Sequence, residues 1–199
     1  MSSVVISGNT SGTITLDAPA VAGTTTLTLP ATSGTVVTKD TNGIASVNGI
    51  QFPATQSASA DANTLDDYEE GTWTPTLTPA SGSGMTFDSR GTYVKIGKQV
   101  TVLFDIQVTS KGTASGALKL SGLPFTRDTT YVMGSASIPY YLNMQTSLVS
   151  IGVYIDSNNT TGTLMKTTAA ATSITDLLAS DISAGGNTRF ATTVTYFTA

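Results

Sequence analysis

The residues best able to do chemistry in this chain are four carboxylates at one boundary: Asp66, Asp67, Glu69 and Glu70. Two carboxylates suffice for glycoside hydrolysis, and clustered carboxylates can hold a hard cation such as Ca²⁺. Adjacent acids on an extended chain point to opposite faces, so a hydrolytic pair would need a second segment, with Asp105 or Asp156. The cluster also lacks the fixed loop spacing of a calcium motif. We therefore favour a solvated acidic loop and predict no metal site, with Ca²⁺ at this boundary left open.

The rest of the composition removes most other enzyme classes. The chain has no His and no Cys, so neither a Ser-His-Asp nor a Cys-His nucleophile can form. No Ser-x-x-Lys pair and no phosphate-binding Gly loop occurs. The sequence therefore predicts a protein that is not an enzyme and binds no cofactor, held together without disulfides.

Aromatic residues mark two further places of interest. Tyr68 and Trp73 flank the acidic cluster, where they could grip a sugar or a neighbouring subunit or close the end of a core. Tyr140 and Tyr141 are adjacent, so on a strand one ring points inward and the other outward. We interpret the outward ring as a candidate contact for a glycan or a protein.

Charge and hydropathy exclude two classes of partner. The chain carries a net charge of −4, and its nine Lys and Arg are scattered without a basic stripe. Phosphate backbones need clustered cations, so nucleic-acid binding is not expected. No apolar run approaches the roughly 20 residues of a spanning helix, and the first residues lack a signal-peptide pattern. No membrane partner is predicted.

Residues 1–48 read as an extended arm of short strands. Runs of period two occupy 3–7, 13–16, 24–29 and 35–38 and are separated by glycine turns. Large apolar side chains are too few to close a core against an ordering cost of about 1–2 kcal/mol per residue. The arm is therefore predicted to order on other chains, and its candidate contact residues are Ile14, Leu16, Leu27, Leu29 and Val36.

A linker and a domain follow. Residues 49–64 are small and polar with one hydrophobic anchor, and residues 65–199 carry the large apolar side chains of a core. The strongest strand signal is the alternation over 99–108, which we place at the centre of a sheet. Pro75 marks an edge strand over 72–78. The only segment that tolerates a helix is 173–178, with one turn or none. The predicted fold is all-β: an extended arm followed by an antiparallel, jelly-roll-like β-sandwich.

Several motifs resemble those of tailed-bacteriophage virion surface and appendage proteins. The arm motifs are GTITLDAP from Gly12, AGTTTLTLPA from Ala22 and SGTVVT from Ser33. The junction motifs are IQFPATQ from Ile50 and NTLDDYEEGTWTP from Asn63, followed by GTYVKIGKQVTV from Gly91. The resemblance reaches to about residue 125 and transfers no catalytic residues. It implies an arm that attaches to the virion or to sister chains and a β domain displayed outward as a trimer.

Three functions follow as expectations from the resemblance and the composition. The leading one is a non-enzymatic, homotrimeric decoration or cement protein, or short fibre protein, that binds capsid or tail proteins, is made in the host bacterial cytoplasm and resides in the virion. The second is a receptor-binding tip that recognises host glycan through Tyr140 or Tyr141. The third is a carboxylate-based glycosidase.

Overall fold

The computed structural model describes residues 3–7, 12–17, 31, 49–53, 55, 59–61, 64–131, 133–169 and 171–198. It divides into two units, Met1–Ile50 and Gln51–Ala199. The division falls inside the segment that the sequence assigns to the linker. Among the described residues no helix is long and apolar enough to cross a membrane.

The first unit contains a two-stranded antiparallel hairpin of β1 (Ser3–Ser7) and β2 (Thr13–Asp17). Ser3 pairs with Asp17 and Ser7 with Thr13, which places Ile14 opposite Ile6 and Leu16 opposite Val4. Both strands match sequence predictions, and their pairing with each other was not anticipated. The other candidate contacts of the arm, Leu27, Leu29 and Val36, lie outside the described residues, as do the predicted strands 24–29 and 35–38.

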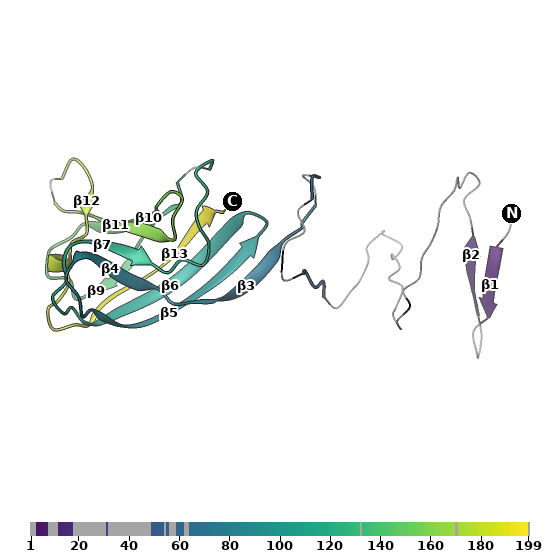
Figure 1. Cartoon of the computed structure of the whole chain (residues 1–199), viewed down its shortest axis with the longest axis horizontal. Helices are drawn as coiled ribbons and strands as arrows, with labels where there is room; N and C mark the ends of the chain where they lie inside the picture. The colour runs from purple at the N-terminus through teal and green to yellow at the C-terminus, as the bar shows by residue number, and fades with distance from the viewer. Residues whose placement is uncertain are drawn as a thin grey trace. The chain divides into compact units, whose positions relative to one another are not determined.

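The second unit is a sandwich of two antiparallel sheets, which confirms the all-β sandwich prediction (Figure 1). One sheet has the spatial order β4 (Thr76–Ser81), β7 (Ser115–Ser121), β11 (Thr161–Thr167), β10 (Ser150–Ile155) and β8 (Ser135–Ser137), with β12 (Thr175–Asp176) paired to β11. The other sheet has the order β3 (Tyr68–Trp73), β5 (Thr86–Ile96), β6 (Gln99–Ser110), β13 (Thr188–Phe197) and β9 (Tyr140–Leu142). The jelly-roll topology stays a prediction.

The core lies between the two sheets and follows the alternation of the strands. On β6, at the centre of its sheet as predicted, the inward residues Val100, Val102, Phe104, Ile106 and Val108 are all buried. β10 repeats the pattern with Ile151, Val153 and Ile155. Apolar burial of this kind contributes about 25 cal/mol per Å² and accounts for the stability of a chain without disulfides.

Two short links carry the chain from one sheet to the other. Thr74 and Pro75 join β3 to β4, and Ile138 and Pro139 join β8 to β9. Each link connects the outermost strand of one sheet to the outermost strand of the other. The single predicted strand over 72–78 is therefore wrong in one respect, because Pro75 breaks it into two strands of different sheets. Its edge position is confirmed, and Trp73, Pro75 and Leu77 are all buried as their shared face predicts.

One hairpin and one short segment can also be compared with the sequence predictions. Ile96 pairs with Gln99, so Gly97 and Lys98 form a two-residue turn, and Gly97 adopts a φ of 55°. Of the two alternatives at 173–178, one helical turn or none, the structure shows none: Thr175 and Asp176 pair with β11, and a 3₁₀ turn, η1 (Ala179–Asp181), follows. Six residues give too few helical hydrogen bonds to offset nucleation when a strand edge is available.

Candidate functional site

The acidic boundary is built into the fold. Asp67 is buried and forms an ion pair with Lys95 of β5, and the Asp67 carbonyl accepts a hydrogen bond of 2.8 Å from the Gly97 N–H. Asp66 accepts a 2.7 Å bond from the Ser59 N–H. The prediction of a solvated acidic loop is therefore wrong for Asp67, because a lysine 28 residues away in sequence compensates its charge.

Glu69 and Glu70 lie on opposite faces of β3. Glu69 accepts a hydrogen bond from the Tyr93 hydroxyl, which raises the pKa of Tyr93 to about 12. Glu70 accepts a 3.0 Å bond from the Tyr68 hydroxyl on the outer face, which raises the pKa of that phenol. Among the described residues no group of three or more acidic side chains is arranged to hold a metal ion.

The two aromatic residues of the boundary have different surroundings. Trp73 is 8% exposed, packs edge-on against Phe104 with ring centroids 6.2 Å apart, and donates from Nε1 to the Leu103 and Thr92 carbonyls. Tyr68 is 41% exposed, and its ring centroid lies 6.2 Å from that of Phe52. Trp73 is a core residue, whereas Tyr68 lies on the surface against Phe52 of the linker.

The second aromatic pair divides between core and surface, as the alternation requires. On β9, Tyr141 pairs with the buried Phe190 and packs against the core, and Tyr140 pairs with Ala191 on the outer face. Tyr140 is 44% exposed. The structure therefore identifies Tyr140 as the outward ring of the pair.

Polar side chains extend from Tyr140 across the outer face of the five-stranded sheet. The Arg189 guanidinium carbon lies 5.8 Å from the centre of the Tyr140 ring, and Arg189 donates two hydrogen bonds to Asp105, of 2.8 and 2.5 Å. Arg90 lies 3.4 Å from the same carboxylate and is 79% exposed. The hydrogen bond from Arg189, with the charges of both arginines, lowers the pKa of Asp105. Asp105 is thus a paired anion and a poor general acid.

Two hollows lie beside this row. The first, of about 490 Å³, is bordered on the outer face by Arg90, Thr92, Leu103, Asp105, Ala191 and Thr193. It exists because Ala191 and the threonines are shorter than their neighbours. The second, of about 400 Å³, lies between two loops and is lined by Asn143, Met144, Gln145, Ser183, Gly185, Gly186 and Asn187.

The second hollow is shaped by backbone that asparagine and glycine tolerate. Asn143 and Asn187 have φ of 56° and 67°, in the left-handed region. Asn143 Nδ2 donates to the Asn187 carbonyl at 2.9 Å, and Gln107 Nε2 on the outer face of β6 donates to Asn187 Oδ1 at 3.3 Å. The amides of the loops are thereby tied to the sheet that carries Tyr140. Sequence reasoning missed this hollow, although Gly185, Gly186 and Asn187 form a turn signal that could have located it.

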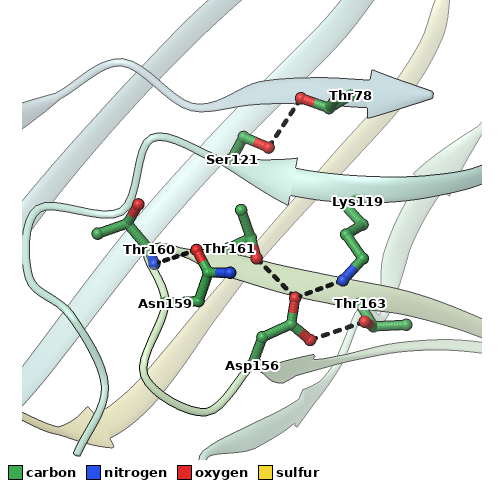
Figure 2. Close-up of polar contacts among 8 residues, drawn as sticks. All are labelled: Thr78, Lys119, Ser121, Asp156, Asn159, Thr160, Thr161 and Thr163. Carbon is green, nitrogen blue, oxygen red and sulfur yellow. Dashed lines mark hydrogen bonds and ion pairs between the residues drawn. The ribbon is translucent and has the colours of Figure 1, made fainter. Parts of the chain in front are cut away.

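The outer face of the six-stranded sheet carries a separate polar cluster (Figure 2). Asp156 accepts hydrogen bonds from Lys119 at 2.8 Å, Thr161 at 2.6 Å and Thr163 at 2.8 Å. Burial alone would raise the pKa of Asp156, but these hydrogen bonds outweigh it and lower that pKa. Lys119 lies between the fully buried Leu118 and Leu120 and therefore points away from the core. Asp105 and Asp156 thus occupy the outer faces of different sheets.

A buried carboxylate holds the loops of the second hollow in place. Asp181, 2% exposed, accepts hydrogen bonds from Lys166 at 2.5 Å, Thr146 at 2.7 Å and the Leu178 N–H at 2.8 Å. Its carbonyl accepts a 2.8 Å bond from the Gln145 N–H, next to the bridge between Met144 and Ile182. This arrangement fixes the two hollow-lining loops to one another.

Comparison with known proteins gives one structural match. Neither a protein-family model nor a curated protein matches this sequence. The structure is similar to the crystal structure of the Dettilon tailspike protein, with a TM-score of 0.53 and 21% identity, over 65% of this chain and 23% of that chain. The chain therefore matches less than a quarter of the tailspike's length. At this identity the likeness concerns the fold alone.

Proposed function

We propose that this chain is a non-enzymatic structural protein of a tailed-bacteriophage virion, carried on a tail appendage. The observation that supports this proposal most is the fold that the chain shares with part of a tailspike protein. The arm and junction motifs, which resemble those of phage appendage proteins, support it independently. In this function the arm attaches the protein to the particle or to sister chains, and the sandwich is displayed outward.

Labelling this protein on assembled particles tests the proposal. Gold-tagged antibody against the sandwich should mark the tail in electron micrographs. Label on the head would instead support a capsid decoration or cement protein, and absence of the protein from purified particles would overturn a virion function altogether.

Attachment through the arm is tested by truncation. Removing residues 1–48 should leave the fluorescence of the buried Trp73 unchanged while abolishing incorporation into particles. The matched control is the full chain with the same tag. Normal incorporation of the truncated protein would show that the sandwich itself makes the attachment.

The proposed assembly is a homotrimer. The outer face of the five-stranded sheet carries five large apolar side chains that are at least 41% exposed: Tyr68, Ile96, Leu103, Tyr140 and Leu142. Exposed apolar side chains on one face of a sheet are candidate contacts with sister chains. Light scattering on the full chain should give three times the chain mass, and a monomer at micromolar concentration would refute this part.

A second candidate function is recognition of a host glycan, favoured by the exposed Tyr140 beside Arg189 and the amide-lined hollow. Sugars are bound by stacking on aromatic rings and by planar hydrogen-bonding groups, and this end of the sheet offers both. Binding of the full chain to host cells should fall at least tenfold in Tyr140→Ala. Tyr131→Ala, which removes a ring that is 37% exposed elsewhere, serves as the matched control. Equal binding by both variants and the parent would exclude this site.

A further inference from the structure

Asp67, Glu69 and Lys95 form a cluster at the end of the sandwich where β3 begins. Glu69 lies directly opposite Lys95 in the register of β3 and β5, and the bond from the Gly97 N–H to the Asp67 carbonyl extends this pairing by one residue. Alternate residues of a strand share a face, so all three side chains project from the same, inner side. The cluster therefore brings one amine and two carboxyl groups together at an edge strand.

The pair of Asp67 and Lys95 is shielded from water. Their side chains are 11% and 8% exposed, and Lys95 Nζ lies 5.6 Å from the centre of the Phe125 ring. Burial lowers the pKa of Lys95. Desolvation disfavours both charges, so transfer of a proton from the ammonium to the carboxylate gives a neutral amine beside a neutral carboxylic acid.

The other buried lysine–aspartate pair of the described residues differs in its hydrogen bonds. Asp181 accepts from Thr146 and the Leu178 N–H in addition to Lys166, and these donors stabilise the charged carboxylate. Within the part of the chain that the structure describes, the Asp67 carboxylate receives a hydrogen bond from Lys95 alone. The charged form of the carboxylate therefore has fewer stabilising donors at Asp67 than at Asp181.

We propose that Lys95 and Asp67 condense into an intramolecular amide bond. The lone pair of the neutral Lys95 Nζ attacks Asp67 Cγ, a C–N bond forms, the C–OH bond breaks, and one water molecule leaves. The reaction is a condensation without change of oxidation state, so it requires no oxidant, reductant or further reactant. In this scheme Glu69, opposite Lys95 in the strand register, accepts the proton from the amine and returns it to the departing hydroxyl, and the hydrogen bond from Tyr93 orients its carboxylate.

The bond would join the edge strand β3 to β5 at the point where the linker enters the sandwich. The chain has no Cys, so a disulfide cannot supply this covalent connection. An edge strand lacks a second neighbour, which makes it the first strand of a sheet to separate under load. This inference does not depend on the proposed function.

The test is the intact mass of the full chain after denaturation. The parent protein should be lighter than its sequence mass by one water molecule. In Asp67→Asn the same bond would release ammonia from the side-chain amide at position 67, so this variant should be lighter by one ammonia molecule. Lys95→Arg is the matched control, because it keeps the positive charge without a nucleophilic amine, and it should have its full sequence mass. A parent protein at the full sequence mass would overturn the proposal and leave an ion pair only.

Tryptic mapping of the parent protein decides the question even where a variant fails to fold. Trypsin should spare Lys95, and residues 91–98 should appear joined to residues 40–90. A missing water located at any other residue, or a free peptide ending at Lys95, would refute the assignment. Glu69→Gln should fold with unchanged Trp73 fluorescence and slow the loss of water at least tenfold, and an unaltered rate would exclude Glu69 as the proton carrier.

Discussion

The buried pair of Lys166 and Asp181 gives the sharpest test of how this fold holds its loops. The two side chains are 12% and 3% exposed, and the carboxylate keeps its other donors when the lysine is removed. Lys166→Met should therefore leave a buried carboxylate without a countercharge. Breaking such a pair from one side costs about 3–5 kcal/mol. The unfolding equilibrium constant should therefore increase by a factor between about one hundred and several thousand.

Urea denaturation followed by Trp73 fluorescence measures this cost, because Trp73 is the single tryptophan and is buried in the core. A loss of this size is a large share of the about 5–15 kcal/mol that stabilises a typical domain. The double variant Lys166→Met with Asp181→Asn should regain most of the loss, since it removes the stranded charge and keeps an acceptor for Thr146.

Lys119→Met provides the matched control for this experiment. Lys119 also forms an ion pair with an aspartate, but its side chain is 49% exposed, so its removal should cost less than about 1 kcal/mol. Equal effects of the Lys166 and Lys119 variants, or a loss below about 1 kcal/mol for Lys166→Met, would refute the view that burial makes the first pair expensive to break.

Further predictions concern acid stability and the packing of Trp73. Burial alone would raise the pKa of Asp181, but hydrogen bonds from Lys166, the Leu178 N–H and Thr146 outweigh it and lower that pKa. Because the folded pKa is below the unfolded value of about 4, this stabilisation is complete above pH about 4 and is lost as pH falls through the folded pKa. Urea midpoints at falling pH should show a shallower decline in Asp181→Asn, and parallel declines would contradict this. A Cβ added at Gly91 would lie 2.4 Å from Trp73 Nε1, so Gly91→Ala should cost about 1–3 kcal/mol, whereas Gly185→Ala, with open space around it, should be neutral by the same measurement.

Local patterns were enough to predict the central strand β6 but not which strands pair with it. The alternation of Val100, Val102, Phe104 and Ile106 gives both the strand and its burial, because one side of a central strand must face the core. Pro75 indicated an edge, yet nothing local shows that the chain changes sheets there. That change depends on which strands pair with β3 and β4, and this pairing is set by the whole fold.

The candidate sites show the same division. Adjacent rings at Tyr140 and Tyr141 predicted one outward side chain, since the period of a strand is two. The pairing of Arg189 with Asp105 joins residues 84 apart in sequence, and the pairing of Lys95 with Asp67 joins residues 28 apart. The sequence predicted a solvated loop at Asp67, because the lysine that pairs with this carboxylate becomes its neighbour only through strand register.

The two proline-containing links, at Pro75 and Pro139, join the two sheets covalently at both of their edges. At each edge the main chain runs directly from one sheet to the other through two residues, so these short links restrict sliding of the sheets past each other. Proline has no N–H, so each link also offers one fewer backbone donor to a strand of another chain. New chain ends or grafted segments therefore belong away from these two links, because opening either one would release two outer strands at once.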